Sequence, residues 1–156
     1  STGGFTQVLL KYNAKKIYSI DVGYGQLHEK IKANKKVISL ERKNAKYLTK
    51  QEIKDSIDLI VCDASFISLK KVIKIPIKFL KKKGEIIALI KPQFEAKRAE
   101  VKGGVIKDAL VHERICMEIK DWFFNENNFK VCSIIESSIK GPKGNKEFFI
   151  YAIKND

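Results

Sequence analysis

The chain has 156 residues, of which 31 are Lys or Arg and 18 are Asp or Glu, so its formal net charge is 31 − 18 = +13. Because 44% of the residues are hydrophobic, the composition excludes a disordered chain and suffices for one domain with a real core. No apolar run approaches the roughly 18 residues of a membrane-spanning helix, and no signal peptide is visible at the N-terminus, so we expect a cytoplasmic protein.

Short β-branched segments alternate with amphipathic segments, which predicts an α/β fold with a mostly parallel sheet. We expect strands over residues 16–20, 37–40, 57–62, 85–90, 130–135 and 147–153. We expect helices over residues 4–12, 26–33, 66–82 and 109–125, with Pro76 bending or splitting the third helix and lysines 81–83 at its solvated end. The last two strands follow each other without a helix, which favours an antiparallel pair at the sheet edge.

Residues 91–107 interrupt this alternation. The segment is too polar for a core, and Gly103-Gly104 breaks any helix. It follows directly the carboxyl end of a predicted strand, where open α/β sheets place their ligand sites. We therefore predict a long functional loop.

Cysteine and histidine give no metal-binding pattern. The three cysteines are scattered, without metal-type spacing, and are expected to be buried, reduced thiols: Cys62, Cys116 and Cys132. His28 and His112 lie beside acidic residues in predicted helices, which indicates surface positions. We expect no metal site.

Two glycine-bearing turns are candidates for a nucleotide site, residues 1–5 (STGGF) and 21–25 (DVGYG). Asp21 follows Gly3 by 18 residues, and Glu41 follows Gly23 by 18 residues; a ribose-binding acid is expected about 20 residues after such glycines. The local pattern favours the second turn because a predicted strand precedes it, although His28 stands where a dinucleotide fingerprint has glycine. Tight turns without a ligand are the alternative for both.

Charged residues directly follow two buried strands. Asp63 follows residues 57–62 and Lys91 follows residues 85–90, so a parallel sheet would place both at its carboxyl edge. Burial disfavours the charged form of lysine, and a neutral amine can act as a base. The alternative is that Lys91 reaches solvent and pairs with Glu95 or Asp63. The polar loop beside this pair favours a site, and Glu147 begins the last predicted strand.

The positive charge suggests a polyanionic partner, because cationic surfaces gain affinity by releasing counterions from nucleic acid. A compositional lysine bias is the alternative explanation, since 28 of the 31 basic residues are Lys.

Several motifs can then be read together: STGGFT, DVGYGQL, ERKNAKYL, DASFISL, IKPQFE, GGVIKD with VHER, and GPKGNKEFF. Their order and identity resemble the TlyA family, also called hemolysin A, whose methyltransferase domain is FtsJ-like. The resemblance covers essentially the whole chain, and its most specific parts are IKPQFE and GPKGNKEF.

The resemblance implies methyl transfer from S-adenosylmethionine to a ribose 2′-hydroxyl of ribosomal RNA. It implies a Rossmann-like, seven-stranded, mostly parallel sheet with an antiparallel last strand. It favours the first glycine turn and implies these cofactor-binding residues: Ser1, Gly3, Gly4, Phe5, Asp21, Glu41, Asn44 and Asp63. Asp63, Lys91 and Glu147 match three members of the family's Lys-Asp-Lys-Glu catalytic tetrad.

The expected partner is ribosomal RNA or a ribosomal subunit, with phosphate contacts from six basic residues: Lys97, Arg98, Lys102, Lys140, Lys143 and Lys146. The family's first tetrad lysine, its first strand and a small RNA-binding domain lie upstream of STGGFT. The resemblance therefore implies that residues 1–156 are an N-terminally truncated FtsJ-like domain. Two alternatives are a membrane-active protein, as the older family name suggests, and a non-catalytic RNA-binding module.

Overall fold

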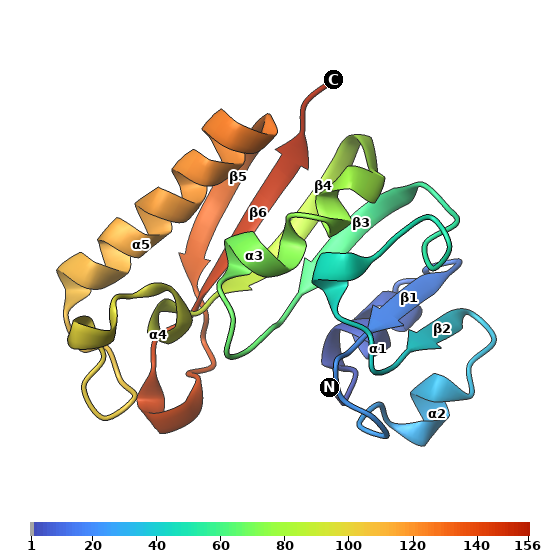
Figure 1. Ribbon diagram of the computed structural model, residues 1–156, viewed down its shortest axis with the longest axis horizontal. Helices are drawn as coiled ribbons and strands as arrows, with labels where there is room; N and C mark the ends of the chain where they lie inside the picture. The colour runs from blue at the N-terminus through green and yellow to red at the C-terminus, as the bar shows by residue number, and fades with distance from the viewer. Residues whose placement is uncertain (1) are drawn as a thin grey trace. The chain divides into compact units, whose positions relative to one another are not determined.

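A computed structural model describes residues 2–156 (Figure 1). The backbone divides into two units, an N-terminal unit, Ser1–Asp55, and a C-terminal unit, Ser56–Asp156. None of the helices within residues 2–156 is long and apolar enough to cross a membrane.

The N-terminal unit is built on two short parallel strands, β1 (Ile17–Ile20) and β2 (Val37–Leu40), paired from Ile17↔Val37 to Ile20↔Leu40. Its helices are α1 (Gly4–Lys11), α2 (Glu29–Lys32) and the 3-10 turn η1 (Ala45–Tyr47). Ile17, Leu27 and Val37 form its buried core. Both strands and the first helix confirm the prediction.

The second predicted helix is shorter than expected. It begins at Glu29 and not at residue 26, because His28 is extended and caps the helix by accepting a hydrogen bond from the Lys30 N–H. Leu27 is buried in the core instead of continuing a helical turn.

The C-terminal unit contains a four-stranded sheet in the order β3-β4-β6-β5. Its strands are β3 (Ile57–Cys62), β4 (Leu80–Ile90), β5 (Phe129–Glu136) and β6 (Phe148–Lys154). β3 and β4 are parallel, whereas β6 is antiparallel to both β4 and β5. The predicted antiparallel pair is confirmed, with β5 at the edge and β6 inside the sheet.

Helix α5 (Ala109–Asp121) lies along β5 in Figure 1 and ends in a π-helical turn, η4 (Trp122–Glu126). It buries Ile115 and Ile119 in the main core. Phe123 is fully buried and meets the Trp122 and Phe129 rings edge-on, at centroid distances of 5.2 and 5.4 Å. This aromatic cluster anchors the end of the helix.

The predicted helix over residues 66–82 is confirmed only in part: Pro76 splits it as expected, but residues 80–82 belong to a strand. The segment forms α3 (Leu69–Ile73), the 3-10 turn η2 (Pro76–Phe79) and the start of β4. Pro76 ends the helical path because it lacks an N–H and starts the 3-10 turn. Lysines 81–83 belong to β4, where the pairing with β3 is irregular and Lys83 has a φ of 58°.

Three smaller predictions also need correction. His112 is buried and packs against Phe148, with ring centroids 5.8 Å apart. Cys132 is exposed and not buried as predicted. All three cysteines are free thiols, and burial raises the pKa of Cys62 and of Cys116 to about 11. The segment 91–107 is not wholly polar loop: it contains α4 (Pro92–Glu95), η3 (Arg98–Glu100) and the buried Ile106.

Glu95 joins α4 to the first turn of α3. Its carboxylate accepts hydrogen bonds from the Leu69 N–H, at 2.5 Å, and from Ser68 Oγ, at 2.7 Å. Burial raises the pKa of Glu95 above its ordinary value. The folded state therefore favours the protonated acid more than the unfolded state does.

We predict that Glu95→Gln changes how stability depends on pH. A raised folded-state pKa gives a contribution that is present at low pH and lost as pH rises through it. The wild type should thus gain stability relative to the Gln variant between pH 7 and pH 4. Urea unfolding of both proteins across this range measures the difference, and a constant or reversed difference would contradict the assignment.

Candidate active site at the carboxyl end of β4

Lys91 directly follows the last residue of β4 and is only 9% exposed. Pro92 begins α4 and keeps the preceding residue extended, so Lys91 has φ −113° and ψ 95°. Both Ile90 and Pro92 are buried. The chain therefore buries the lysine stem where the strand stops, and its amine must find polar partners.

The Lys91 amine has two such partners, which both come from the segment after β3. Its Nζ lies 2.6 Å from Asp63 Oδ1 and donates to Ser65 Oγ at 3.0 Å. The parallel pairing of β3 and β4 brings the ends of both strands to the same edge, as predicted. The alternative expectation for Lys91 is therefore half right: Lys91 pairs with Asp63, but it is buried, and Glu95 is bound to the start of α3 instead.

Glu147 reaches this sheet end through the antiparallel register of β6. Ile90 pairs with Phe148, so Lys91 and Glu147 occupy the next opposing positions. Glu147 is 6% exposed and accepts a hydrogen bond at 2.9 Å from Gln93 Nε2. A Cβ atom at Gly141 would overlap the Glu147 carboxyl group, so a larger residue there would displace the carboxylate from its present position.

The structure thus brings the three predicted catalytic residues, Asp63, Lys91 and Glu147, to one end of one sheet. Sequence reasoning missed Ser65 and Gln93. Each stands two residues after a predicted catalytic residue, in DASF and KPQF. This spacing could have indicated both residues, because residues that closely follow the end of a strand remain near that end.

The predicted RNA-binding residues lie on two loops that Asn145 joins. Asn145 is 2% exposed; its amide donates to the carbonyls of Gly104, at 2.8 Å, and Pro142, at 3.0 Å, and its Oδ1 accepts from the Ile106 N–H at 3.1 Å. Lys143 Nζ adds a bond to the Gly103 carbonyl at 2.9 Å. The two loops therefore form one local structure.

All six predicted RNA-binding side chains are exposed: Lys97, Arg98, Lys102, Lys140, Lys143 and Lys146. Lys146 lies 3.2 Å from Glu136, and both side chains are about half exposed. Such a surface pair is weak and readily exchanged for another anion. The loops accordingly present a group of cations to solvent.

The first glycine turn belongs to the N-terminal unit. Gly3 has a φ of 103°, and a Cβ there would come within 2.6 Å of Leu27 Cδ1 and 2.9 Å of Ile31 Cδ1. Only glycine meets both conditions. Gly3 is the N-cap of α1, which Gly4 and Phe5 begin, and as a glycine it has no side chain with which to cap the helix. Ser1, the other predicted member, lies outside the described residues.

The second glycine turn is held by two carboxylates. Asp21 Oδ1 accepts from the Gly23 N–H at 2.8 Å, and Glu41 Oε1 accepts from the Gly25 N–H at 3.0 Å. Glu41 also pairs with Lys32 at 2.7 Å, and this hydrogen bond is the main cause that lowers its pKa. Asn44, another predicted cofactor residue, accepts from the Lys46 N–H and caps η1.

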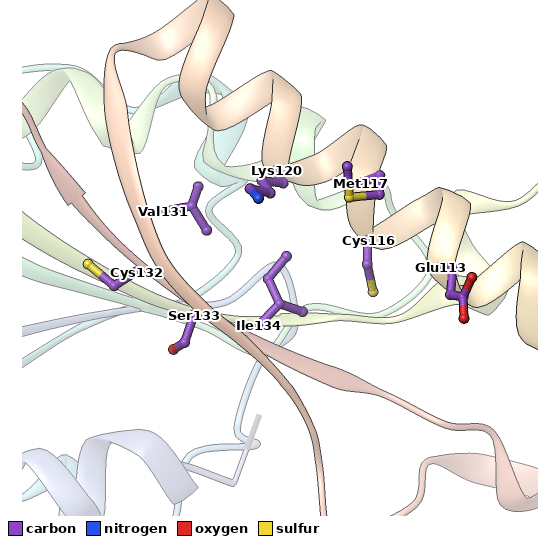
Figure 2. A pocket seen from close by; sticks show the side chains of 8 residues that line it. All are labelled: Glu113, Cys116, Met117, Lys120, Val131, Cys132, Ser133 and Ile134. Atoms are coloured by element: carbon purple, nitrogen blue, oxygen red, sulfur yellow. The ribbon is translucent and has the colours of Figure 1, made fainter.

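A shallow hollow of about 500 Å³ lies elsewhere, between α5 and β5 (Figure 2). Eight side chains line it: Glu113, Cys116, Met117, Lys120, Val131, Cys132, Ser133 and Ile134. It includes none of the predicted site residues. Within residues 2–156, no group of three or more His, Cys, Asp or Glu side chains is arranged to hold a metal ion.

We predict that Asn145→Ala destabilises the C-terminal unit by about 2 kcal/mol, because it leaves the Ile106 N–H and two carbonyls without their partner. Urea unfolding measures this loss. Asn125→Ala is the matched control at an exposed position and should stay within about 0.5 kcal/mol of the wild type. Equal effects of the two substitutions would contradict the role given to Asn145.

Comparison with known proteins identifies the family. The profile of the FtsJ-like methyltransferase family matches residues 1–154. Hemolysin A from Brachyspira hyodysenteriae is 44% identical over an alignment 159 residues long, gaps included, and the alignment covers 98% of this chain and 64% of that protein. The 16S/23S rRNA (cytidine-2′-O)-methyltransferase TlyA from Mycobacterium tuberculosis is 38% identical over 152 residues, which cover 97% of this chain and 56% of that protein.

The chain therefore spans less than two thirds of either curated relative. A solved structure of a candidate hemolysin from Lactococcus lactis matches with a TM-score of 0.94 at 37% identity, covering 99% of this chain and 74% of that one. Solved methyltransferases at 15–16% identity match with TM-scores of 0.65 and share the fold. The Rossmann-like methyltransferase fold is confirmed, and the chain belongs to the FtsJ-like methyltransferase family, as its TlyA and hemolysin A motifs predicted.

Proposed function

We propose that this chain carries the methyl-transfer site of a ribosomal RNA methyltransferase that modifies a ribose 2′-hydroxyl. The observation that supports this most is the buried Lys91 amine, paired with Asp63 at the strand end to which β6 also brings Glu147. The family and the name of the TlyA relative point to the same reaction. The 2′-hydroxyl exists in RNA and not in DNA, so RNA is the substrate.

The cofactor of this reaction is S-adenosylmethionine, which supplies an electrophilic methyl group on a sulfonium cation. The tight turn at Gly3, the glycine N-cap of α1 and the turn carboxylates fit a nucleotide-like ligand. By family resemblance, the cofactor residues in the N-terminal unit are Gly3, Gly4, Phe5, Asp21, Glu41 and Asn44, with Ser1 as a further member. By the same resemblance, Asp63 is the cofactor residue nearest the methyl group that is transferred.

Lys91 acts as the base. A ribose hydroxyl is a poor nucleophile until it loses its proton, and a neutral Lys91 amine accepts that proton. The product of this step is an ammonium 2.6 Å from the Asp63 carboxylate. At this distance the Asp63 carboxylate stabilises the ammonium that proton transfer produces. Glu147 holds the target sugar by accepting a hydrogen bond from it.

The exposed cations on the two loops bind the RNA phosphates. They belong to a chain with a net charge of +13, and phosphate contacts make affinity fall steeply with salt. The chain spans 64% and 56% of the length of the two curated relatives named above. By family resemblance, we propose that the intact cytoplasmic enzyme also carries the first tetrad lysine and the first strand of the family's sheet.

We predict that Lys91→Ala in the full-length gene product slows methyl transfer to ribosomal RNA about 100-fold or more, the range typical of a lost general base. Calorimetry should show S-adenosylmethionine binding within a few-fold of wild type. The control is Lys74→Ala, at an exposed position beside α3, which should leave the rate unchanged.

Wild-type turnover by the Lys91→Ala protein would refute the base assignment. A wild-type protein that binds RNA with steep salt dependence, yet transfers no labelled methyl group, would instead be a non-catalytic RNA-binding module.

A further inference from the structure

Gln93 lies in the first turn of α4, two residues after Lys91. Its amide nitrogen lies 2.9 Å from Glu147 Oε1. An ionised carboxylate only accepts hydrogen bonds, so the NH₂ group of Gln93 must face Glu147 and its oxygen must point elsewhere. The chemistry of the pair thus fixes the orientation of the amide.

The amide oxygen that results is buried and has no hydrogen-bond partner within the described part of the chain. A buried acceptor without a donor destabilises a fold by about 1–3 kcal/mol. An apolar side chain of similar size would avoid this cost. The contact that Gln93 makes and an apolar residue would not is the hydrogen bond to Glu147.

The choice of donor also matters to Glu147. This carboxylate is 6% exposed and needs donors to remain charged. A lysine or arginine at position 93 would supply them, but it would neutralise the carboxylate in an ion pair. A neutral amide holds the carboxylate in place and leaves its negative charge for another donor, such as a sugar hydroxyl.

We propose that Gln93 is a positioning residue that fixes the Glu147 carboxylate for the target ribose. This inference rests on the proposed function and extends it to a residue outside the catalytic tetrad. Gly141 also borders the carboxylate, because a Cβ at position 141 would overlap Glu147 Oε1 and would displace it. Gln93 touches neither cofactor nor substrate in this role and acts through Glu147.

The test uses Gln93→Met in the full-length gene product, because methionine fills similar space without a donor or an orphaned oxygen. We expect kcat for methyl transfer to ribosomal RNA to fall at least 10-fold. The KM for S-adenosylmethionine should stay within 2-fold, and urea unfolding should show unchanged or increased stability. Gln51→Met, at an exposed position, is the matched control.

A double-mutant cycle shows whether the effect passes through Glu147. Once Glu147→Gln has removed the carboxylate, adding Gln93→Met should slow the reaction no further, because residues acting as a unit are not additive. Additive losses would overturn the positioning role.

Gln93→Glu gives an independent readout through the pH profile. At low pH the new acid is protonated and donates to Glu147, whereas at high pH the two carboxylates repel each other. Glu147 contacts position 93 directly, Lys91 and Glu95 flank it in the chain, and α5, which packs against α4, carries the buried His112. The activity of this variant relative to wild type should therefore fall as pH rises, and a flat ratio would contradict the inference.

The outcomes also separate the two proposals. An active wild type with an equally active Gln93→Met protein overturns the role of Gln93 alone. A full-length wild type that transfers no methyl group to RNA overturns the proposed function, and the role of Gln93 with it.

Discussion

A lysine amine buried at the end of an apolar strand must be paired, and the candidate site depends on how this chain meets that requirement. Lys91 is 9% exposed in the structure, so its amine takes its partners from the protein. Its partners are Asp63 and Ser65, which the parallel β3 brings to the same edge. The Asp63 side chain is half exposed, so removing Asp63 should cost more than losing a pair of exposed side chains and less than breaking a fully buried pair.

The antiparallel β6 adds the second half of the site. An inserted strand that runs against its neighbours starts where β4 ends, so its first residues lie beside Lys91. The loop before β6 is tied to the 102–106 turn through Asn145. The same segment of chain therefore positions Glu147 and presents the exposed lysines, which links the proposed chemistry to the proposed RNA contacts.

Much of this fold could be predicted from sequence, because strands of the buried sheet appear as short apolar runs with charged residues at their ends. Asp63 and Lys91 were found in this way. The prediction of a helix up to residue 82 was wrong at its end, because apolar residues recur at helical spacing on both sides of Pro76, whereas β4 begins at Leu80. The prediction of a surface position for His112 was wrong, because it relied on the acidic neighbours in the chain, whereas the His112 side chain is buried.

The roles of Gln93 and Asn145 could not be read from the sequence. Both act through hydrogen bonds to residues distant in the chain: Gln93 to Glu147, and Asn145 to the 104–106 turn. Neither forms a periodic pattern or a charge run that a local reading detects. The choice between the two glycine turns likewise came from family resemblance, because local spacing was the same for both.

The central claim is that the site transfers a methyl group to a ribose oxygen of ribosomal RNA. The most direct measurement treats ribosomal RNA with the full-length gene product and isotopically labelled S-adenosylmethionine, then digests the RNA to nucleosides for mass spectrometry. We expect the label on the sugar fragment of a nucleoside, and we expect the 3′ phosphodiester of that nucleotide in undigested RNA to resist alkaline hydrolysis. Label on a base, or none on RNA, would contradict it.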